Sequence, residues 1–549
     1  MKQDAALEER AVSGTRRDMV AWSLGMALLL ALALRAYRLG ARNLWFDEAW
    51  SWYISQHPIR FILEEGRSNI HPPLLPIVLK FWTALFGDSA AVLRLPSLLA
   101  SVGIVAGAYW LGRQILSRPA ALLVAFLLAL SPHQVFYAQE ARMYALVTAL
   151  TLGAVLCYVR FLRREGLLPN LSKATVAFER SDIPGSSHPR RKSDMAGALG
   201  YMVSGALALY THLFGMLVLA AVNLHFLGLI VHRGRELSSS PWVSVRRWVL
   251  WQLGVLILYA PWLMTFIYQV RSRPRQEWRP PLEHTDLIEE FFLFVGKMSV
   301  GAFVYPQGVF YALKNLVEYR WNAEMLLRAL ENLSLYPLAI GLGLFLLWRG
   351  TRAAAGAGLL QALFFIPVLL ICGVLLALRQ YMDFGRYLTM ITPYYFLLLA
   401  AAVMSLRGKW SRRITVGLLS VPMLLGLKAH YRAPLFDSDY RPVASILTAE
   451  WRHGDRILVD PAYMDRCLRY ELRATPIVHA LPPAELPPLP LADHLEQTRE
   501  ARVWVVIDYR SPLFSEPDLR LSQWTIVSDR RFPSSDSRIR LLLLRRRIP

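Results

Sequence analysis

The sequence predicts an α-helical polytopic membrane protein that carries a small C-terminal α/β domain outside the membrane. Hydrophobic residues make up 55% of the 549 residues and charged residues only 18%, whereas about a quarter of a typical soluble domain is charged. Apolar runs long enough to cross a bilayer recur as far as residue 428. Beyond that point, short strand-like runs alternate with polar turns. The composition therefore excludes an ordinary soluble enzyme and a disordered chain.

Eleven apolar runs are predicted to span the membrane, because each approaches the length of about 20 residues that a spanning helix needs. No small-residue cleavage site clearly follows the first run, so we interpret it as an uncleaved span and not as a signal peptide. No internal repeat is visible along the chain. The runs lie near residues 19–36, 91–112, 119–137, 142–161, 196–210, 213–231, 248–270, 335–348, 356–378, 388–406 and 412–428.

The formal net charge of +21 is explained by where the basic residues lie. Such a charge can indicate nucleic-acid binding, but here Lys and Arg gather in alternate loops, which the positive-inside rule assigns to the cytoplasm. We therefore predict a multi-pass protein of the cytoplasmic (inner) membrane. Its N-terminus is cytoplasmic, its C-terminal domain is extracytoplasmic, and it has no nucleic-acid partner. The basic clusters include Arg16 and Arg17, Arg190–Lys192, Arg246 and Arg247, and Arg407–Arg413.

The extracytoplasmic loops contain most of the other polar residues that are candidates for chemistry. The first of these loops, residues 37–90, has two amphipathic-looking stretches at 47–65 and 73–86, which we expect to be helices lying in the membrane interface. A second large loop, 271–334, is partly helical by pattern and rich in aromatic residues, and a short loop covers 379–387. We expect the chemistry in these loops.

The C-terminal extracytoplasmic domain is predicted to cover residues 429–549 and to follow a transmembrane domain of residues 1–428. A helix is expected over 440–452, and the proline-rich segment 481–490 is expected to be a loop. The three cysteines lie far apart without a C-x-x-C pair, so no disulfide framework or thiolate metal site is predicted. Strands are expected at 456–460, 476–480, 502–508, 524–527 and 539–544.

An acidic pair, Asp47 and Glu48, follows the first span and begins the first helical stretch of the external loop. Adjacent carboxylates repel each other, and on a helix they point about 100° apart, so only one of them can face a given site. The pair also suits a helix start, where Asp47 would be the N-cap and Glu48 would favour the positive end of the helix. A catalytic carboxylate and a helix cap are both open interpretations at this point.

Histidines and arginines lie at the predicted extracytoplasmic ends of the spans. His71 precedes two prolines and His212 lies on a very short turn. Ionisable groups at this depth are costly and often functional, although either histidine also suits a plain loop that faces water. Arg94 and Arg142 can bind phosphate bidentately or snorkel to the interface, and Glu140 can pair with Arg142 to fix the loop. The tryptophans of the first loop are interpreted mainly as an interfacial belt.

These motifs, through their order, spacing and common side of the membrane, resemble glycosyltransferase family 39, which includes the protein O-mannosyltransferases and the lipid A aminoarabinose transferase. The family is part of the membrane-embedded C superfamily of glycosyltransferases, so the resemblance implies the fold of that superfamily. It covers roughly residues 35–400 and, more weakly, the C-terminal domain. The matching residues are Phe46-Asp47-Glu48, His71–Leu74, Arg94–Ser97, Ser131-Pro132, Gln139–Tyr144, Tyr210–His212 and Arg386-Tyr387.

The resemblance implies a hexosyl- or pentosyltransferase that takes a sugar from a polyprenyl phosphate at the outer membrane face. The sugar passes with inversion to a hydroxyl of an acceptor lipid, glycan or protein, in contact with membrane lipids. Asp47 matches the family's catalytic aspartate, and a carboxylate can accept the hydroxyl proton as the new bond forms. Glu48 completes the predicted catalytic pair, with a structural or acceptor-facing role.

The leaving lipid phosphate gains negative charge during such a transfer, so cationic groups must lie beside it. Arg386, with Tyr381 and Tyr387 on the same external turn, is the favoured phosphate ligand. The rest of the predicted donor- or substrate-binding set is His71, Arg94, Arg142 and His212.

The chain departs from the aminoarabinose branch of the family at the proline pair. A Glu-Lys dipeptide precedes the prolines in that branch, whereas Ile70 and His71 stand here. His71 can replace the lysine as a cation only when its ring is protonated. The metal-holding glutamate is absent, and Asp47, His71 and His212 would form a metal set only if the fold brought them together. We predict no metal and no other cofactor, and a sugar other than aminoarabinose is mildly favoured.

Two other classes of function were weighed against the transferase. A transporter or flippase of a lipid-linked sugar predicts inverted repeats and ionisable groups in mid-span, and neither is clear in this sequence. A non-catalytic scaffold that displays the C-terminal domain would make the loop with Asp47, Glu48 and His71 dispensable. For the C-terminal domain itself, acceptor binding and bracing of the external loops are both open.

Overall fold

The computed structural model divides into two compact units, which are described separately. The helical unit consists of Met1–Tyr37, Glu64–Leu75 and Arg94–Tyr431, and the α/β unit of Arg38–Leu63, Pro76–Leu93 and Arg432–Pro549. The structure describes residues 2–68, 71–168, 195–233, 241–272, 286–300, 339–353, 357–432, 439–482, 491–514, 523–532 and 539–547.

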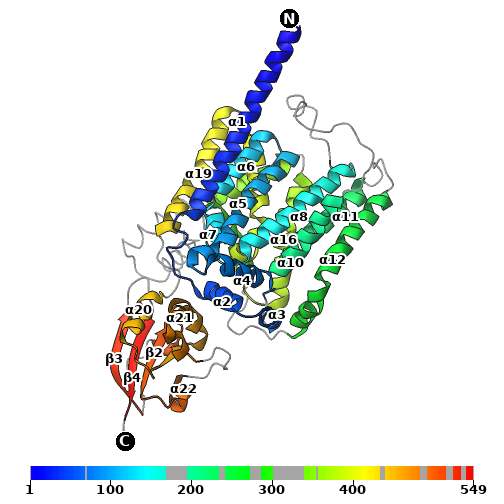
Figure 1. The fold of residues 1–549 in the computed structure, drawn as a ribbon. Coiled ribbons are helices and arrows are strands. Elements are labelled where there is room, and N and C mark those ends of the chain that lie inside the picture. The colour runs from blue at the N-terminus through cyan, green and yellow to red at the C-terminus, as the bar shows by residue number, and fades with distance from the viewer. Residues whose placement is uncertain are drawn as a thin grey trace. The chain divides into compact units, whose positions relative to one another are not determined.

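The helical unit is a bundle in which helices far apart in the sequence pack side by side (Figure 1). Helix α10 lies between α8 and α12, α6 packs against α1 and α18, and α11 packs against α16. A further helical stretch covers 339–353. The named elements are α1 (Lys2–Ala36), α5 (Ala90–Ile115), α6 (Arg118–Leu130), α7 (Pro132–Ala138), α8 (Tyr144–Arg164), α10 (Met195–Thr211), α11 (Gly215–Arg233), α12 (Pro241–Ser272), α13 (Asp286–Val300), α16 (Ala357–Leu378), α17 (Phe384–Tyr387), the 3-10 turn η2 (Thr389–Ile391), α18 (Thr392–Met404) and α19 (Lys409–Arg432).

Seven helices among the described residues are long and apolar enough to cross a membrane, and the bent pair α6 and α7 makes an eighth. Within the described residues the predicted spans are largely helical, but two of them, at Met195–Thr211 and Thr389–Met404, form shorter apolar helices. The span predicted at 335–348 lies partly outside the described residues. The predicted class, a polytopic helical membrane protein with a small C-terminal sheet, is confirmed. The seven are Met19–Ala36, Ala90–Ile115, Tyr144–Arg164, Gly215–His232, Trp242–Gln269, Gly358–Leu378 and Lys409–Arg432.

The predicted span at 119–137 is broken by a 59° bend between α6 and α7. Pro132 cannot donate a backbone hydrogen bond, so the last carbonyls of α6 lose their helical partners. The fully buried guanidinium of Arg35 donates to the carbonyls of Leu128 and Ala129 at 3.0 and 3.1 Å. The side-chain amide of Gln139 donates to the Arg35 carbonyl at 2.9 Å. These bonds fix the bend and the start of the loop that follows α7.

The α/β unit contains α2, the first half of α3, most of α4 and a four-stranded sheet of order β1-β2-β4-β3. Strands β1 and β2 are parallel, and the other two pairs are antiparallel. The named elements are α2 (Phe46–Ser55), α3 (Ile59–Ser68), α4 (Leu74–Phe86), α20 (Arg441–Glu450), β1 (Arg456–Asp460), η3 (Ala462–Met464), α21 (Asp465–Leu472), η4 (Pro476–Ala480), α22 (Leu491–Gln497), β2 (Arg502–Asp508), η5 (Pro512–Phe514), β3 (Trp524–Phe532) and β4 (Ile539–Arg546).

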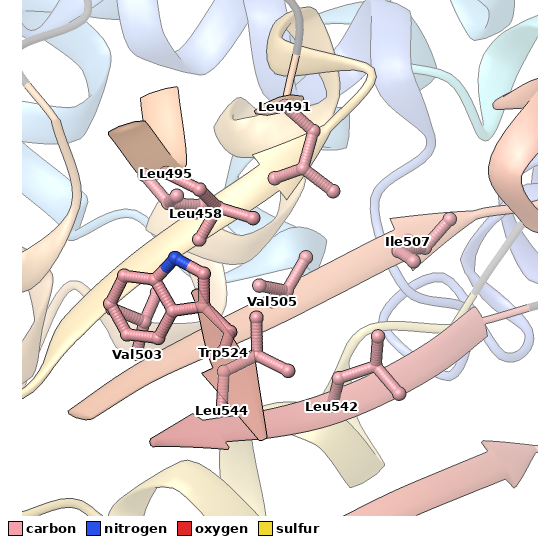
Figure 2. Packing of buried hydrophobic residues seen from close by; sticks show 9 residues of the cluster. All are labelled: Leu458, Leu491, Leu495, Val503, Val505, Ile507, Trp524, Leu542 and Leu544. Atoms are coloured by element: carbon pink, nitrogen blue, oxygen red, sulfur yellow. The ribbon is translucent and has the colours of Figure 1, made fainter. Parts of the chain in front are cut away.

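The core of the sheet centres on β2, where residues 503–508 are all buried. A continuous apolar run of this kind is typical of a strand covered on both faces. On one face, Val503, Val505 and Ile507 pack with Trp524 and with residues of β1, β4 and α22 (Figure 2). The predicted strands at 456–460 and 502–508 have the observed bounds, and those predicted at 524–527 and 539–544 are extended by a few residues.

Two predicted elements differ from the structure. The strand predicted at 476–480 is wrong, since Pro476–Ala480 forms the 3-10 helix η4, with Ile477 and Ala480 buried at the three-residue spacing of such a helix. The helix predicted over 47–65 is two helices, because α2 ends at Ser55 and Pro58 precedes α3. Most of the loop predicted at 481–490 and the residues of 271–334 beyond α13 lie outside the described residues.

Candidate functional site

The predicted site residues fall into both units. Asp47 and Glu48 belong to the α/β unit, and each unit's residues are therefore described with that unit. The other seven belong to the helical unit: His71, Arg94, Arg142, His212, Tyr381, Arg386 and Tyr387.

Asp47 and Glu48 are the second and third residues of α2. The N-cap position is held by Trp45 and has no side-chain cap, so the interpretation of Asp47 as the N-cap is wrong. Glu48 is only 1% exposed, whereas the side chain of Asp47 is half-buried. The pair thus diverges as helix geometry requires, and Asp47 is the more exposed of the two carboxylates.

Arg142 and His71 meet in the helical unit. The Nη2 atom of Arg142 lies 3.4 Å from Nε2 of His71. Because guanidinium nitrogens only donate, Nε2 of His71 is the acceptor in this contact. Ser97 donates to the Arg142 carbonyl at 3.1 Å, which ties this loop to α5.

The side chains of Arg94 and Arg142 are covered by protein, at 3% and 5% exposure. A snorkelling arginine extends its guanidinium to water, so the snorkelling interpretation does not fit either residue. Glu140 is also buried, at 6% exposure. Its charge acts on the nearby Tyr137 together with that of Arg386. Arg94, Glu140 and Arg142 thus belong to the interior of the helical unit.

His212 lies on the turn between α10 and α11 and is 6% exposed. Its Nδ1 accepts the Phe214 amide at 3.1 Å, so the ring donates through Nε2. Its centroid lies 6.0 Å from that of Tyr144 and 5.9 Å from that of Tyr387. Burial, and then the charge of Arg142, lower the pKa of His212 to about 3. His71, Arg142, Tyr144, His212 and Tyr387 together are called the basic–aromatic cluster below.

The turn that carries Arg386 is fixed to α13 by one buried carboxylate. Glu290, 2% exposed, accepts the Phe384 amide at 3.0 Å and the hydroxyl of Tyr381. Burial raises the pKa of Glu290, although Lys297 and the two hydrogen bonds oppose this shift. Tyr381, predicted as a phosphate ligand, is therefore engaged with α13 in this structure.

A second carboxylate, Asp383, anchors the same turn. Its Oδ1 accepts the Gly385 amide at 2.7 Å, which caps α17, and accepts Nζ of Lys297 at 2.9 Å. Burial favours the neutral acid, but Lys297, Arg386 and the Gly385 amide outweigh burial and lower the pKa of Asp383. Arg386 and Tyr387 follow this cap and are half-buried.

Glu290, Lys297 and Asp383 were missed by sequence reasoning. Asp383 and Lys297 are 86 residues apart, and Glu290 and Phe384 are 94 residues apart. The local signal was the set of charged residues Asp286, Glu289, Glu290 and Lys297 on a mostly apolar helix of the second large loop. Within the described ranges, no three or more His, Cys, Asp and Glu side chains form a group that could hold a metal ion.

The comparisons with known proteins agree with this architecture. Residues 70–174 match the family described as dolichyl-phosphate-mannose-protein mannosyltransferase. The structure is similar to ArnT from Cupriavidus metallidurans in the apo state, with 14% identity, 96% of this chain and 98% of that chain covered, and a TM-score of 0.56. It is also similar to the same protein bound to undecaprenyl phosphate, with 15% identity, 95% of this chain and 98% of that chain covered, and a TM-score of 0.51.

The fold is similar to that of ArnT over nearly the whole chain. The predicted resemblance to glycosyltransferase family 39 is thereby confirmed, by sequence over 70–174 and by fold over nearly the whole chain. None of the curated proteins matches the chain in sequence. The sequence match includes His71, Arg94 and Arg142 but not Asp47, so the roles of the individual site residues stay predictions.

Proposed function

We propose that the protein transfers a sugar from a polyprenyl-phosphate donor to a hydroxyl of an acceptor lipid, glycan or protein, at the outer face of the cytoplasmic membrane. The observation that carries the proposal is the likeness of nearly the whole chain to ArnT, which has also been solved with bound undecaprenyl phosphate. The match of residues 70–174 to a mannosyltransferase family supports the same chemistry.

The donor phosphate binds at the basic–aromatic cluster and the adjacent Arg386. A guanidinium such as that of Arg142 offers paired donors to phosphate oxygens and keeps its charge as the leaving group becomes more anionic. His212, neutral with Nε2–H, adds a donor without a charge, and Tyr387 adds a hydroxyl. Burial of Arg142 strengthens its interaction with an anion, since the local dielectric constant is low.

Asp47 acts as the general base in a single inverting displacement. Its carboxylate takes the proton from the acceptor hydroxyl while the hydroxyl oxygen bonds to the anomeric carbon and the bond to the phosphate oxygen breaks. Its half-buried position at the start of α2 leaves it accessible, whereas Glu48 is enclosed. Glu48 therefore has the structural part of the pair, and no metal enters the step.

The test compares Asp47→Asn with Glu64→Gln, which removes an exposed carboxylate from the next helix, α3. Sugar transfer from radiolabelled polyprenyl-phosphate sugar and binding of the donor lipid are measured on the full chain in membranes. Asp47→Asn should still bind donor but lose transfer by at least about 100-fold, the lower range of general-base contributions. Glu64→Gln should transfer normally.

Undiminished transfer by Asp47→Asn would remove Asp47 from the mechanism. Movement of the donor across the bilayer without any transfer by the wild type would instead favour a flippase, and absence of both activities would favour the non-catalytic scaffold.

A further inference from the structure

We propose that the C-terminal domain positions α2. Asp47 is oriented toward substrate only when the domain packs against this helix. The inference rests on the proposed function and adds a role for a domain that the chemistry does not otherwise require. It is carried by the α2–α21 interface of the α/β unit. This interface consists of Phe46, Trp50, Trp52, Tyr53 and Asp88 on one side and Tyr463, Arg466, Tyr470 and Arg473 on the other.

The two sides of the interface have matching helical spacing. Phe46, Trp50 and Tyr53 are separated by four and three residues and share one face of α2. On the other side, Arg466 and Tyr470 lie four residues apart on α21, and Arg473 follows three residues later. Aromatic side chains of α2 thus meet arginine and tyrosine side chains of the C-terminal domain along about two turns of helix.

Ring contacts fix the first turns of α2. The rings of Phe46 and Tyr463 meet edge to face at 5.3 Å. The Arg466 guanidinium lies 4.8 Å from the ring centroid of Trp50 and 5.5 Å from that of Tyr53. Such cation–π contacts are strongest when the cation is shielded from water, and the Arg466 side chain is only 13% exposed. Phe46 directly precedes Asp47, so these contacts act next to the base.

Asp88 joins the two sides through a single carboxylate oxygen. Its Oδ2 accepts Nε1 of Trp52 at 3.1 Å and Nε of Arg473 at 3.0 Å. The hydroxyl of Tyr470 donates to the Asp88 carbonyl at 3.1 Å, and the Tyr470 ring meets that of Trp52 edge to face at 5.2 Å. Asp88, which lies just after α4, therefore joins α2 to α21 and to Arg473 through hydrogen bonds.

The packing of α2 against the C-terminal domain sets the orientation of Asp47. Trp52 lies one turn after Glu48, and both side chains are buried on the same face. Asp47 is rotated about 100° from that face. A helix of ten residues has little stability of its own in water, so its orientation depends on its packing. Loss of the interface should let α2 fray or rotate and should misplace the base without altering the groups of the helical unit.

The test uses Asp88→Ala, Asp88→Asn and Trp52→Phe in the full chain, with Arg530→Ala as the matched control. Arg530 pairs with Glu450 at 2.7 Å inside the same unit, between β3 and α20. The side chains of Arg530 and Glu450 are 38% and 40% exposed, which is comparable with 28% and 34% for Arg473 and Asp88. Trp52→Phe keeps a ring against Tyr470 but loses the Nε1 hydrogen bond and some buried volume, so it serves if Asp88→Ala does not fold.

Two measurements are made on each variant: hydrogen exchange of the α2 amides by mass spectrometry, and kcat and donor KM for sugar transfer. Asp88→Ala should exchange faster in α2 and lose about tenfold or more in kcat, with donor KM within about twofold, because misplacing a catalytic group by about 1 Å can cost on the order of 100-fold. Asp88→Asn, which can still accept from Trp52, should recover part of the loss. Arg530→Ala should match the wild type in both measurements.

Faster exchange in α2 with unchanged kcat would overturn the inference and leave the proposed function intact. Unchanged exchange would overturn it as well, since the interface would then not hold α2. Absence of transfer by the wild type would overturn the proposed function and this inference together, whatever the exchange of α2.

Discussion

At the scale of single residues, His212 lies where a proton is unfavourable. It is buried, its Nδ1 is occupied by the Phe214 amide, and the charge of Arg142 acts on it. These conditions bring its pKa to about 3, below the value near 6.5 of an exposed histidine. Between these two values the unfolded chain binds a proton that the folded chain rejects. The stability that His212 contributes is thus complete above about pH 6.5 and declines as the pH falls toward 3.

We therefore expect the wild type to lose more stability than His212→Gln when the pH is lowered from 7.5 to 5. The difference should approach about 2 kcal/mol, since each pH unit below 6.5 is worth about 1.4 kcal/mol. The thermal midpoints of both proteins in detergent at the two pH values measure it, because the other titrating groups are common to both. Equal decreases would show that the histidine is not held neutral in the folded protein.

The candidate residues were predictable from sequence to the extent that their motifs are local. His71 before its prolines, Arg142 in the loop after α7 and His212 on its short turn were all predicted, and the structure brings them into one cluster. That Glu48 is enclosed and Asp47 accessible was not predictable, because the distinction depends on which face of α2 is covered. On the face of Glu48 and Trp52, a covering contact comes from Tyr470, a residue more than 400 positions later.

At the scale of elements, the turn of Tyr381–Tyr387 depends on α13. The four-residue helix α17 is too short to hold its own conformation. Its first amides are instead accepted by Glu290 and Asp383, and Lys297 of α13 pairs with Asp383. Arg386 is carried on this anchored turn. The sequence predicted the turn and its arginine, but not the anchor, because hydrophobic periodicity says nothing about charged partners from another loop.

Removing this anchor should weaken donor binding. Asp383→Ala eliminates both the cap of α17 and the ion pair with Lys297, and loss of a helix cap typically costs about 1 kcal/mol. If the loss of about 1 kcal/mol falls on the turn conformation in which Arg386 binds the donor phosphate, donor KM should rise roughly fivefold. Arg386→Ala should raise it at least as much, because the phosphate then loses a charged ligand. Steady-state kinetics with the lipid donor provide the measurement.

The control for this prediction is Asp383→Asn, which keeps an acceptor for the Gly385 amide and loses only the charge facing Lys297. It should fall between the wild type and Asp383→Ala. The prediction fails if donor KM rises in Arg386→Ala but is unchanged in Asp383→Ala. Arg386 would then keep its position without the Asp383 cap.

At the scale of the whole molecule, the charge distribution and the fold together predict the membrane topology. The span pattern was readable from sequence because a bilayer demands long apolar helices. The bend between α6 and α7 was not, because it depends on Arg35 reaching carbonyls more than 90 residues away. The net charge of +21 is concentrated in alternate loops. If those loops are cytoplasmic, the basic–aromatic cluster and the C-terminal domain both face outward, where a lipid-linked donor and its acceptor would meet.

This orientation can be tested with two single cysteines. Val527 on β3 is 50% exposed, and Lys409 at the start of α19 is exposed within the basic cluster Arg407–Arg413. In intact spheroplasts, a membrane-impermeant maleimide should label Val527→Cys and should label Lys409→Cys only after permeabilisation. The wild type, with Cys467 buried and Cys157 and Cys372 half-buried, supplies the background. The opposite labelling pattern would place the C-terminal domain in the cytoplasm. It would violate the positive-inside rule, and it would move the proposed transfer to the other face of the membrane.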